Sequence, residues 1–275
     1  MSKQTLTTAE LESLAQEIRL SNKYKDLDLP LETIRDLILQ EMPHYRQIKD
    51  VQQVVKKKLH NIVALYLGDP DYPTAQQEIR IAFDTGEDSV RECCLSLLSM
   101  HASTRERLPI LANFYQHLWS ICGAPTSILD LACGLHPFGL PWMQLPPDCS
   151  YTAYDLHHPR VDLLNTFFQL SGCQAQAVYQ DILVSPPQTK ADVAFFFKEA
   201  HRFEQRQHGC NRAFWLALPV QTLLVSLPTT SLTGRHDKAK QHRKLVYETL
   251  EGLDWPVTEI EFENELVFCI TKRYE

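Results

Sequence analysis

The chain has 275 residues, of which 44% are hydrophobic and 22% charged, so it can bury a sizeable core in one large domain or two smaller ones. No uninterrupted apolar run approaches the length of a membrane span, and the first residues, MSKQTLTTAELESLA, lack the basic region and apolar core of a signal peptide. We therefore expect a cytoplasmic protein. The net charge of -7 argues against indiscriminate nucleic-acid binding by the whole surface.

The helical patterns come first in the chain. Apolar residues recur at helical spacing after Thr8, after Pro30 and from Ile48 to Ile62, and two further helices are predicted over 72–85 and 88–100. The sequence GDPDYP at 68–73 predicts a loop between them. We expect an all-helical N-terminal domain over residues 1–95, followed by a second domain over 96–275.

From Ile128 onward, apolar strand candidates alternate with helix candidates. Helices are predicted over 160–171 and 203–218. Strands are predicted over 128–131, 150–154, 175–179, 191–197 and 223–227, with a closing pair at 257–262 and 266–271. This alternation predicts a mostly parallel sheet flanked by helices, and the short connection of the closing pair predicts an antiparallel hairpin at one edge. Such a sheet is typical of methyltransferases rather than dehydrogenases.

The stretch from Ile128 to Met143, ILDLACGLHPFGLPWM, joins the first strand to a turn of small residues. Open α/β sheets bind nucleotide-like ligands at such turns, where Gly134 would let a ligand approach the backbone and Asp130 could meet its polar groups. An ordinary strand and turn explains this stretch equally well when it is considered alone.

The next three predicted strands also end in charged residues. Asp155, 21 residues after Gly134, can accept hydrogen bonds from both hydroxyls of a ribose. Asp181 ends the third strand and Lys198 ends the fourth. Each residue alone could be a strand cap. Because the carboxyl ends of parallel strands meet at one edge, the residues together favour a ligand site there.

Two acids that face a nucleoside, with no second phosphate-binding glycine, indicate S-adenosylmethionine rather than NAD as the cofactor. The amino-acid carboxylate of this cofactor needs a cationic partner. The segment HASTRERLP at 101–109 supplies His101, Arg105 and Arg107 just before the first strand. An arginine can hold a carboxylate through two parallel hydrogen bonds.

Two basic runs contrast with the acidic total. HYRQIKDVQQVVKKK at 44–58 and RHDKAKQHRK at 235–244 each carry five Lys or Arg against one Asp. One such run is often no more than a solvated face, but two favour a polyanionic partner if the fold places them on one side.

The eight cysteines are scattered among mostly apolar neighbours, and none forms a C-x-x-C pair. This pattern favours reduced, buried thiols. His201, His208 and Cys210 match no familiar zinc spacing, so we expect no metal site.

Two motifs, HASTRERLP and DLACGLHP with Pro141, Trp142 and Met143 after it, resemble one known family. This family comprises the 16S ribosomal RNA guanine-N7 methyltransferases of aminoglycoside resistance, which methylate guanine 1405 in the decoding site. Smaller matches extend the resemblance over nearly the whole chain: Gln180, Asp181, Phe197, Lys198, Glu204, SLPTTSLTGR at 226–235 and NELVF at 264–268. The resemblance implies a class I S-adenosylmethionine-dependent methyltransferase fold, which is Rossmann-like, after an all-helical N-terminal domain.

The resemblance also implies roles for individual residues. Arg107 would hold the cofactor carboxylate, Asp155 the ribose and Asp181 the adenine, within a cofactor-binding set of His101, Arg105, Arg107, Asp130, Gly134, Asp155, Asp181 and Ile182. Lys198 and Glu204 would position the target base. The helical domain would dock on 16S ribosomal RNA in the assembled small subunit, with RNA contacts from Arg46, Lys49, Lys56, Lys57, Lys58, Arg235 and Lys238. We expect the protein to act as a monomer.

The implied chemistry needs alignment rather than a general base, because guanine N7 carries an available lone pair. The base must leave its stack to reach the cofactor. Four aromatic residues could stack on it or could simply belong to the core: Phe138, Trp142, Phe197 and Phe203.

Several positions depart from the family pattern, mostly on the base and RNA side. His136 stands where the family usually has Asn, Glu199 to Arg202 replace an apolar turn that contains Pro, and Thr230 stands where a basic residue is common. Two alternatives follow: a methyltransferase with another RNA target, or a catalytically weak homologue that binds the ribosome or RNA.

Overall fold

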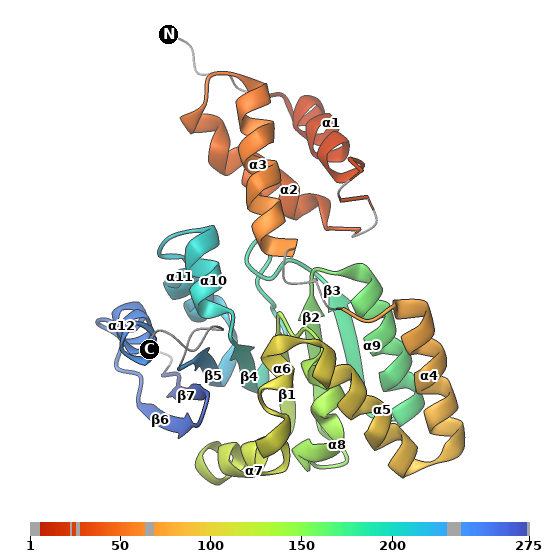
Figure 1. Ribbon diagram of the computed structural model, residues 1–275. Helices are drawn as coiled ribbons and strands as arrows, with labels where there is room; N and C mark the ends of the chain where they lie inside the picture. The colour runs from red at the N-terminus through yellow and green to blue at the C-terminus, as the bar shows by residue number, and fades with distance from the viewer. Residues whose placement is uncertain (1–5, 23, 26–27, 64–68, 230–237, 274–275) are drawn as a thin grey trace.

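The computed structural model describes residues 6–22, 24–25, 28–63, 69–229 and 238–273, which are organised around a seven-stranded sheet (Figure 1). The order across the sheet is β3-β2-β1-β4-β5-β7-β6. In chain order the strands are β1 (Ser127–Leu131), β2 (Ser150–Asp155), β3 (Ala175–Tyr179), β4 (Ala191–Phe197), β5 (Val220–Pro228), β6 (Val257–Phe262) and β7 (Glu265–Thr271).

The first five strands pair in parallel, whereas β7 pairs antiparallel with both β5 and β6. Only Glu263 and Asn264 separate β6 from β7, and a connection of this length permits only antiparallel pairing. The prediction of a mostly parallel sheet with a C-terminal antiparallel hairpin at one edge is therefore confirmed.

Two hydrophobic cores lie on the two faces of the sheet, because successive residues of a strand point in opposite directions. On β4, Phe195 belongs to the first core and Phe196 to the second. The first core includes helices α4 (Tyr72–Thr85), α5 (Glu87–Met100), α7 (Leu111–Cys122) and α9 (His158–Ser171). The second includes α10 (Ala200–Arg206), α11 (Cys210–Ala217) and α12 (Ala239–Thr249).

Short helical turns connect these elements. They are η1 (Met42–His44), α6 (Ala102–Arg105), η3 (Leu108–Ile110), η4 (His136–Gly139) and α8 (Leu140–Met143). The single helix predicted over 203–218 is wrong in its extent, because the chain breaks there between α10 and α11. Gly209 occupies the break with a φ of 74°, a left-handed conformation that a glycine adopts without strain.

A separate bundle of three helices precedes the sheet: α1 (Thr8–Arg19), α2 (Leu31–Glu41) and α3 (Ile48–Val63). A reciprocal pair of hydrogen bonds between Thr7 and Glu10 caps the start of α1. The three helices bury a core of their own, formed by Leu14, Ala15, Ile18, Tyr24, Leu29, Ile34, Leu37, Ile38, Val51, Val55 and Leu59.

Helices α4 and α5 do not share this core. Ala75, Ile79, Leu97 and Leu98 pack instead in the first core of the sheet. Because α4 and α5 pack against the sheet, we propose that the helical domain ends between Val63 and Tyr72. Helices α1 to α3 then form the first domain, and α4 and α5 belong to the second.

The bundle stands above the carboxyl edge of the parallel strands (Figure 1). Thr33 on α2 donates a hydrogen bond of 2.7 Å from Oγ1 to Asp181, which follows β3. Asp36, one turn further along α2, pairs with Arg206 at the end of α10. The three-helix bundle is thus fixed directly over the edge where the predicted ligand site lies.

All eight cysteines are free thiols. The expectation that they are buried is wrong for Cys173, which is exposed, and holds only in part for Cys93 and Cys122, which are half-buried. None of the described helices combines the length and apolar character that crossing a membrane requires.

The proposed domain boundary predicts that the bundle can lose stability locally without the sheet domain. Leu37→Ala should cost about 2–5 kcal/mol within the bundle core and speed amide exchange in α1 to α3, while α4, α5 and the sheet keep their protection. Hydrogen exchange followed by mass spectrometry measures this, with Leu39→Ala on the exposed side of the same helix as the control. Equal loss of protection in α4 and α5 would instead support a domain that extends to residue 95.

Candidate functional site

A cavity of about 250 Å³ opens at the carboxyl edge of β1 to β4, beneath the end of α3. All residues predicted to bind the cofactor line it, except Arg105: His101, Arg107, Asp130, Gly134, Asp155, Asp181 and Ile182. The structure adds Ser103, Arg160 and Arg206, which had no predicted role, and it also brings Lys58, predicted to contact RNA, and Gln180 to the cavity. The carboxyl edge of the parallel strands therefore gathers the expected residues, as their order in the sheet requires.

The turn after β1 lies against the cavity in an unusual backbone conformation. Ala132 and Gly134 both have left-handed φ angles, of 52° and 57°. A Cβ atom added to Gly134 would lie 3.9 Å from the imidazole of His101, so the space would tolerate alanine but the φ angle disfavours it. Left-handed non-glycine residues cost about 1–3 kcal/mol and cluster at functional sites. The turn thus brings backbone rather than side chains to the cavity.

His136 lies behind this turn and is buried. Its Nδ1 lies 2.8 Å from Asp130 Oδ2, and its Nε2 lies 2.9 Å from the hydroxyl of Tyr115. The hydroxyl of Tyr151 donates to the same oxygen of Asp130. Asp130 and His136 therefore support each other at the base of the cavity.

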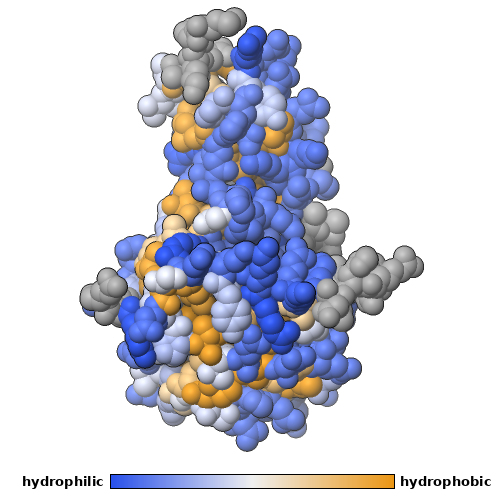
Figure 2. Space-filling view, turned by 90° about the vertical axis from the view of Figure 1, so that its left-hand side faces the viewer, coloured by the Kyte–Doolittle hydropathy of each residue, from blue (hydrophilic) through white to orange (hydrophobic). Residues whose placement is uncertain are grey.

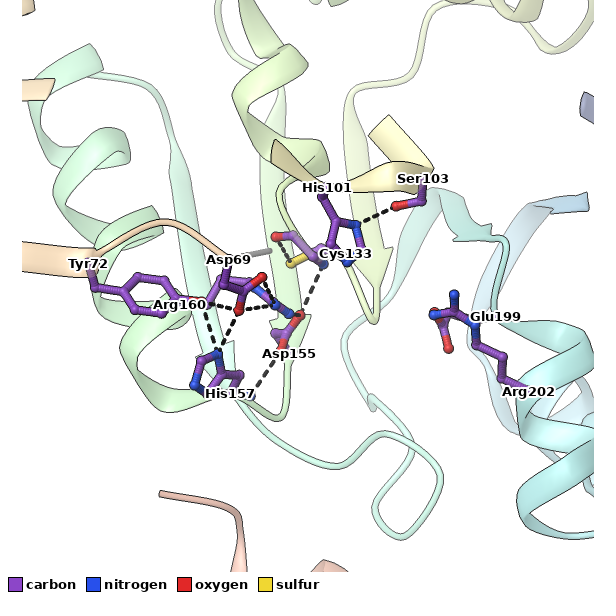
Figure 3. A network of polar contacts seen from close by, with 11 residues as sticks. Asp69, Tyr72, His101, Ser103, Cys133, Asp155, His157, Arg160, Glu199 and Arg202 are labelled. Carbon is purple, nitrogen blue, oxygen red and sulfur yellow. Dashed lines mark hydrogen bonds and ion pairs between the residues drawn. The ribbon is translucent and has the colours of Figure 1, made fainter. Parts of the chain in front are cut away.

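Asp155 closes the cavity beside this turn (Figure 3). Its Oδ2 accepts hydrogen bonds from the backbone N–H of Gly134 at 3.0 Å and from Arg160 Nη1 at 2.8 Å. Its Oδ1 accepts one from the backbone N–H of His157 at 2.9 Å. A carboxylate oxygen can accept two hydrogen bonds, so Oδ1 keeps capacity for a ligand.

Arg160 connects Asp155 to the segment that precedes α4 (Figure 3). Its Nη2 donates to both carboxylate oxygens of Asp69, at 2.7 and 2.9 Å, and His157 Nδ1 lies 3.3 Å from Asp69. Burial opposes ionisation of Asp69, but the hydrogen bond from His157 and the charge of Arg160 lower its pKa below the usual value. The sequence patterns missed this network, whose members lie in GDPDYP and in the HHPR that begins α9.

Asp181 is also held by an arginine and by the bundle. Arg206 Nη2 lies 2.8 Å from Asp181 Oδ2, and Thr33 donates to the same oxygen. The backbone N–H of Leu183 donates to Oδ1. Both acids predicted to hold a nucleoside are therefore buried, ionically paired and fixed in place.

Arg107, predicted to hold the cofactor carboxylate, is already fixed by contacts within the protein. Its Nε and Nη2 both donate to the buried carboxylate of Glu265, and its guanidinium stacks between the rings of Phe114 and Phe197. The paired N–H groups are thus already used by Glu265, which the sequence analysis did not link to Arg107. Nη1 has no hydrogen-bond partner among the residues that the structure describes.

Three residues predicted for the site do not line the cavity. Arg105 is exposed and donates to the carbonyl of Ser99. Lys198 turns its ammonium away to Glu106, at 2.6 Å, and to the carbonyl of Ser103.

Glu204 is the third of these residues. Its carboxylate accepts hydrogen bonds from the backbone N–H of Gly209 and from Asn211, which closes the turn between α10 and α11. Its contacts hold the helix break and do not face the cavity.

The wall of the cavity opposite Asp155 comes from the end of β4 and from α10 (Figure 3). Phe197, Glu199, Arg202 and Phe203 line it. Of the other aromatic candidates for stacking, Phe138 is fully buried in the first core, and Trp142 packs beside it and under Arg91. Only Phe197 and Phe203 are therefore placed to meet a ligand.

The predicted RNA-binding residues divide between the bundle and α12. Arg46, Lys49 and Lys57 are exposed on the bundle, whereas Lys58 is partly buried and lies 2.5 Å from Glu41. Lys56 is partly buried on α3, and Lys238 directly precedes α12 beside β5. Arg235 and Thr230 lie outside the described residues. Figure 2 shows hydrophilic residues over most of the visible face of the bundle.

No cluster of three or more His, Cys, Asp or Glu within the described ranges could hold a metal ion. The residues considered for a zinc site have other contacts: His208 pairs with Glu204, and the thiol of Cys210 donates to the carbonyl of Phe203. Burial lowers the pKa of His201 to about 3, assisted by the charge of Arg202, so this imidazole is neutral near pH 7.

The buried pair of Arg107 and Glu265 predicts a pH-dependent stability. Burial opposes ionisation of Glu265, yet the charges of Arg107 and Lys198 lower its pKa to about 2 from the ordinary 4.5. The pair therefore stabilises the fold above pH 4.5, and its contribution disappears as the pH falls towards 2. Glu265→Gln should cost about 3–5 kcal/mol at pH 7 and flatten this acid-dependent decline, as measured by urea unfolding from pH 2 to 7.

Glu87→Gln provides the matched control, because Glu87 forms an exposed pair with Arg91 and should change stability by less than about 1 kcal/mol. A Glu265→Gln protein as stable as the wild type would show that the buried pair does not stabilise the fold.

Comparisons with known proteins agree with this geometry. The family model for "Ribosomal RNA methyltransferase (FmrO)" matches residues 20–269. A 16S rRNA (guanine(1405)-N(7))-methyltransferase of Micromonospora echinospora is 28% identical over 270 residues, which cover 95% of this chain and 97% of the relative. A protein of the same name from Frankia casuarinae is 30% identical over 222 residues, which cover 79% and 78%.

Solved structures give the same result. The 16S rRNA methyltransferase RmtF, in complex with S-adenosyl-L-homocysteine, is 26% identical with a TM-score of 0.78, covering 98% of this chain and 100% of that chain. The 16S rRNA methylase RmtB is 25% identical with a TM-score of 0.76, covering 96% and 98%. Because the family model spans most of the sequence, the chain belongs to the ribosomal RNA methyltransferase (FmrO) family.

Proposed function

We propose that this protein transfers the methyl group of S-adenosylmethionine to N7 of guanine 1405 in 16S ribosomal RNA, and so confers aminoglycoside resistance. The observation that carries the proposal is the cavity at the carboxyl edge of the sheet, which Gly134, Asp155 and Asp181 line. The chain that forms this cavity belongs to the ribosomal RNA methyltransferase (FmrO) family. The relatives from Micromonospora echinospora and Frankia casuarinae are named for this reaction.

The residues of the cavity fit the cofactor. Asp155 Oδ1 has capacity for the ribose hydroxyls, because it accepts one hydrogen bond from the residues that the structure describes. Asp181 and Ile182 would lie at the adenine, on the side of β3. Arg107 Nη1 and His101 would meet the amino-acid carboxylate, with Arg107 offering one nitrogen rather than a paired contact. The solved structure of RmtF holds the related S-adenosyl-L-homocysteine.

The reaction itself requires little from the protein beyond alignment. S-adenosylmethionine supplies an electrophilic methyl group on a positively charged sulfur. The N7 lone pair of guanine needs no general base, so the chain must place the base in line and exclude water. Phe197 and Phe203, which line the cavity, would contact the base after it has left its stack. Lys198 and Glu204 would not contact the base directly. They would instead hold the β4–α10 segment, which carries these two rings.

We further propose that the bundle docks the enzyme, as a monomer in the cytoplasm, on the assembled small subunit. Exposed Arg46, Lys49 and Lys57, with Lys56 and Lys58 nearby, provide a basic surface in a protein of net charge -7. Lys238, which directly precedes α12, would add a further contact. The contact predicted for Arg235 falls outside the described residues. Electrostatic contacts with phosphates would position the enzyme without reading the RNA sequence.

The proposed reaction predicts 7-methylguanosine at position 1405 when purified small subunits are incubated with the protein and S-adenosylmethionine. Mass mapping of the RNA measures it. Cells that express the protein should become resistant to kanamycin and gentamicin while apramycin remains active. Asp155→Asn is the control, because removing the carboxylate that would bind the ribose should weaken binding of S-adenosylhomocysteine in calorimetry.

Methylation at another RNA position would favour the alternative of a different target. Cofactor binding without any methylated product would favour a catalytically weak RNA-binding homologue.

The docking surface predicts a reduction in subunit affinity that depends on salt. Lys49→Glu with Lys57→Glu should weaken small-subunit binding and reduce the slope of log affinity against log salt by about 1 for each phosphate that the protein no longer binds. Affinity for S-adenosylhomocysteine should stay unchanged, because neither residue lines the cavity. Filter binding over a range of salt concentrations measures the first and calorimetry the second.

The matched control reverses two charges at the amino edge of the sheet, Lys190→Glu with Arg273→Glu, far from the proposed surface. An equal reduction of subunit binding in both double variants would show that net charge, and not the surface of the bundle, determines affinity.

A further inference from the structure

The proposed cofactor would occupy only one side of the cavity and leave the other side free. In the sheet, β1 separates β2 and β3 on one side from β4 on the other. Asp155 and Asp181 follow β2 and β3, so a nucleoside would occupy that side. Phe197, Glu199 and Arg202 line the side of β4 and α10, which remains for the methyl acceptor.

The backbone brings Glu199 into this wall by a local change of direction. Lys198 has a left-handed φ of 60°, and its side chain is buried towards Glu106. Glu199 follows immediately and lines the cavity, and Figure 3 shows it with Arg202 across the open space from Asp155. A strained residue at the end of a central strand is typical of a segment that positions functional side chains.

Glu199 and Arg202 leave hydrogen-bonding groups unused. Arg202 Nη1 donates to Glu199 Oε1 at 2.7 Å. Glu199 Oε2 and the other N–H groups of Arg202 have no partner among the described parts of the chain. Burial raises the pKa of the Glu199 carboxyl, and Arg202 opposes this shift. A carboxylate in such a position gains most from a ligand that brings N–H donors.

The chemistry of guanine matches this pair. Its Watson–Crick edge presents two donors, N1–H and the N2 amino group, beside the acceptor O6. N7 lies on another edge and stays available to the methyl group. Adenine instead presents an acceptor at N1 and would meet the carboxylate with a lone pair.

Building on the proposed function, we infer that Glu199 accepts hydrogen bonds from N1–H and the N2 amino group of the target guanine, while Arg202 donates a hydrogen bond to its O6. These two residues then determine the preference for guanine over adenine. A helical ion pair without such a role would contribute at most about 1 kcal/mol to stability.

The inference predicts a change in base preference. A bidentate base contact discriminates by about 1–3 kcal/mol, or about 5- to 150-fold. Glu199→Gln should therefore lower kcat/KM on normal small subunits by that factor. The ratio of kcat/KM on normal subunits to that on subunits carrying adenosine at 1405 should fall as well, because a glutamine amide can pair with adenine. Affinity for S-adenosylhomocysteine should remain within twofold of wild type.

Glu248→Gln is the matched control, since Glu248 forms an exposed helical pair with Lys244 and should leave all three quantities unchanged. Unchanged kcat/KM in Glu199→Gln would overturn the inference. So would an equal decrease on both kinds of subunit, or a parallel decrease in cofactor affinity, because each indicates a structural role alone. A wild-type protein that forms no 7-methylguanosine would overturn the proposed function instead.

Discussion

Burial of acidic side chains around one cavity is the constraint on which this structure depends. Parallel strands that end at one edge bring Asp155 and Asp181 there, and the hairpin adds Glu265. A buried carboxylate is costly unless a cation and further hydrogen bonds accompany it. Each acid accordingly has a buried or largely buried arginine as its partner, namely Arg160, Arg206 and Arg107. These pairs fix the positions of the acids before any ligand arrives.

The same pairs connect the cavity to the rest of the molecule. Arg160 also binds Asp69 in the segment before α4, and Arg206 also binds Asp36 on α2. The bundle, which we propose docks on RNA, therefore shares ionic partners with the residues that we propose hold the cofactor. A shift of the bundle relative to the sheet would therefore disturb the contacts of Asp181 directly.

Two of the positions expected to depart from the family pattern have different surroundings in the structure. His136 is buried between Asp130 and Tyr115, where its ring nitrogens serve the packing behind the cofactor turn. Glu199 instead lines the cavity and keeps an unused oxygen. His136 thus supports Asp130 behind the turn after β1, whereas Glu199 adds a polar group to the wall formed by the end of β4 and α10.

The sequence by itself determined the sheet, its closing hairpin and the acids that gather at its carboxyl edge, because strand periodicity and residues at strand ends are local signals. Only the tertiary structure decided three further features. These are the pairing of Arg107 with Glu265, the network of Arg160 and Asp69, and the turn held by Glu204. These contacts join residues far apart in the chain or depend on a helix break that periodicity does not reveal. The division of the helices near Val63 is of the same kind, because two helical patterns look alike in sequence until packing assigns each to a core.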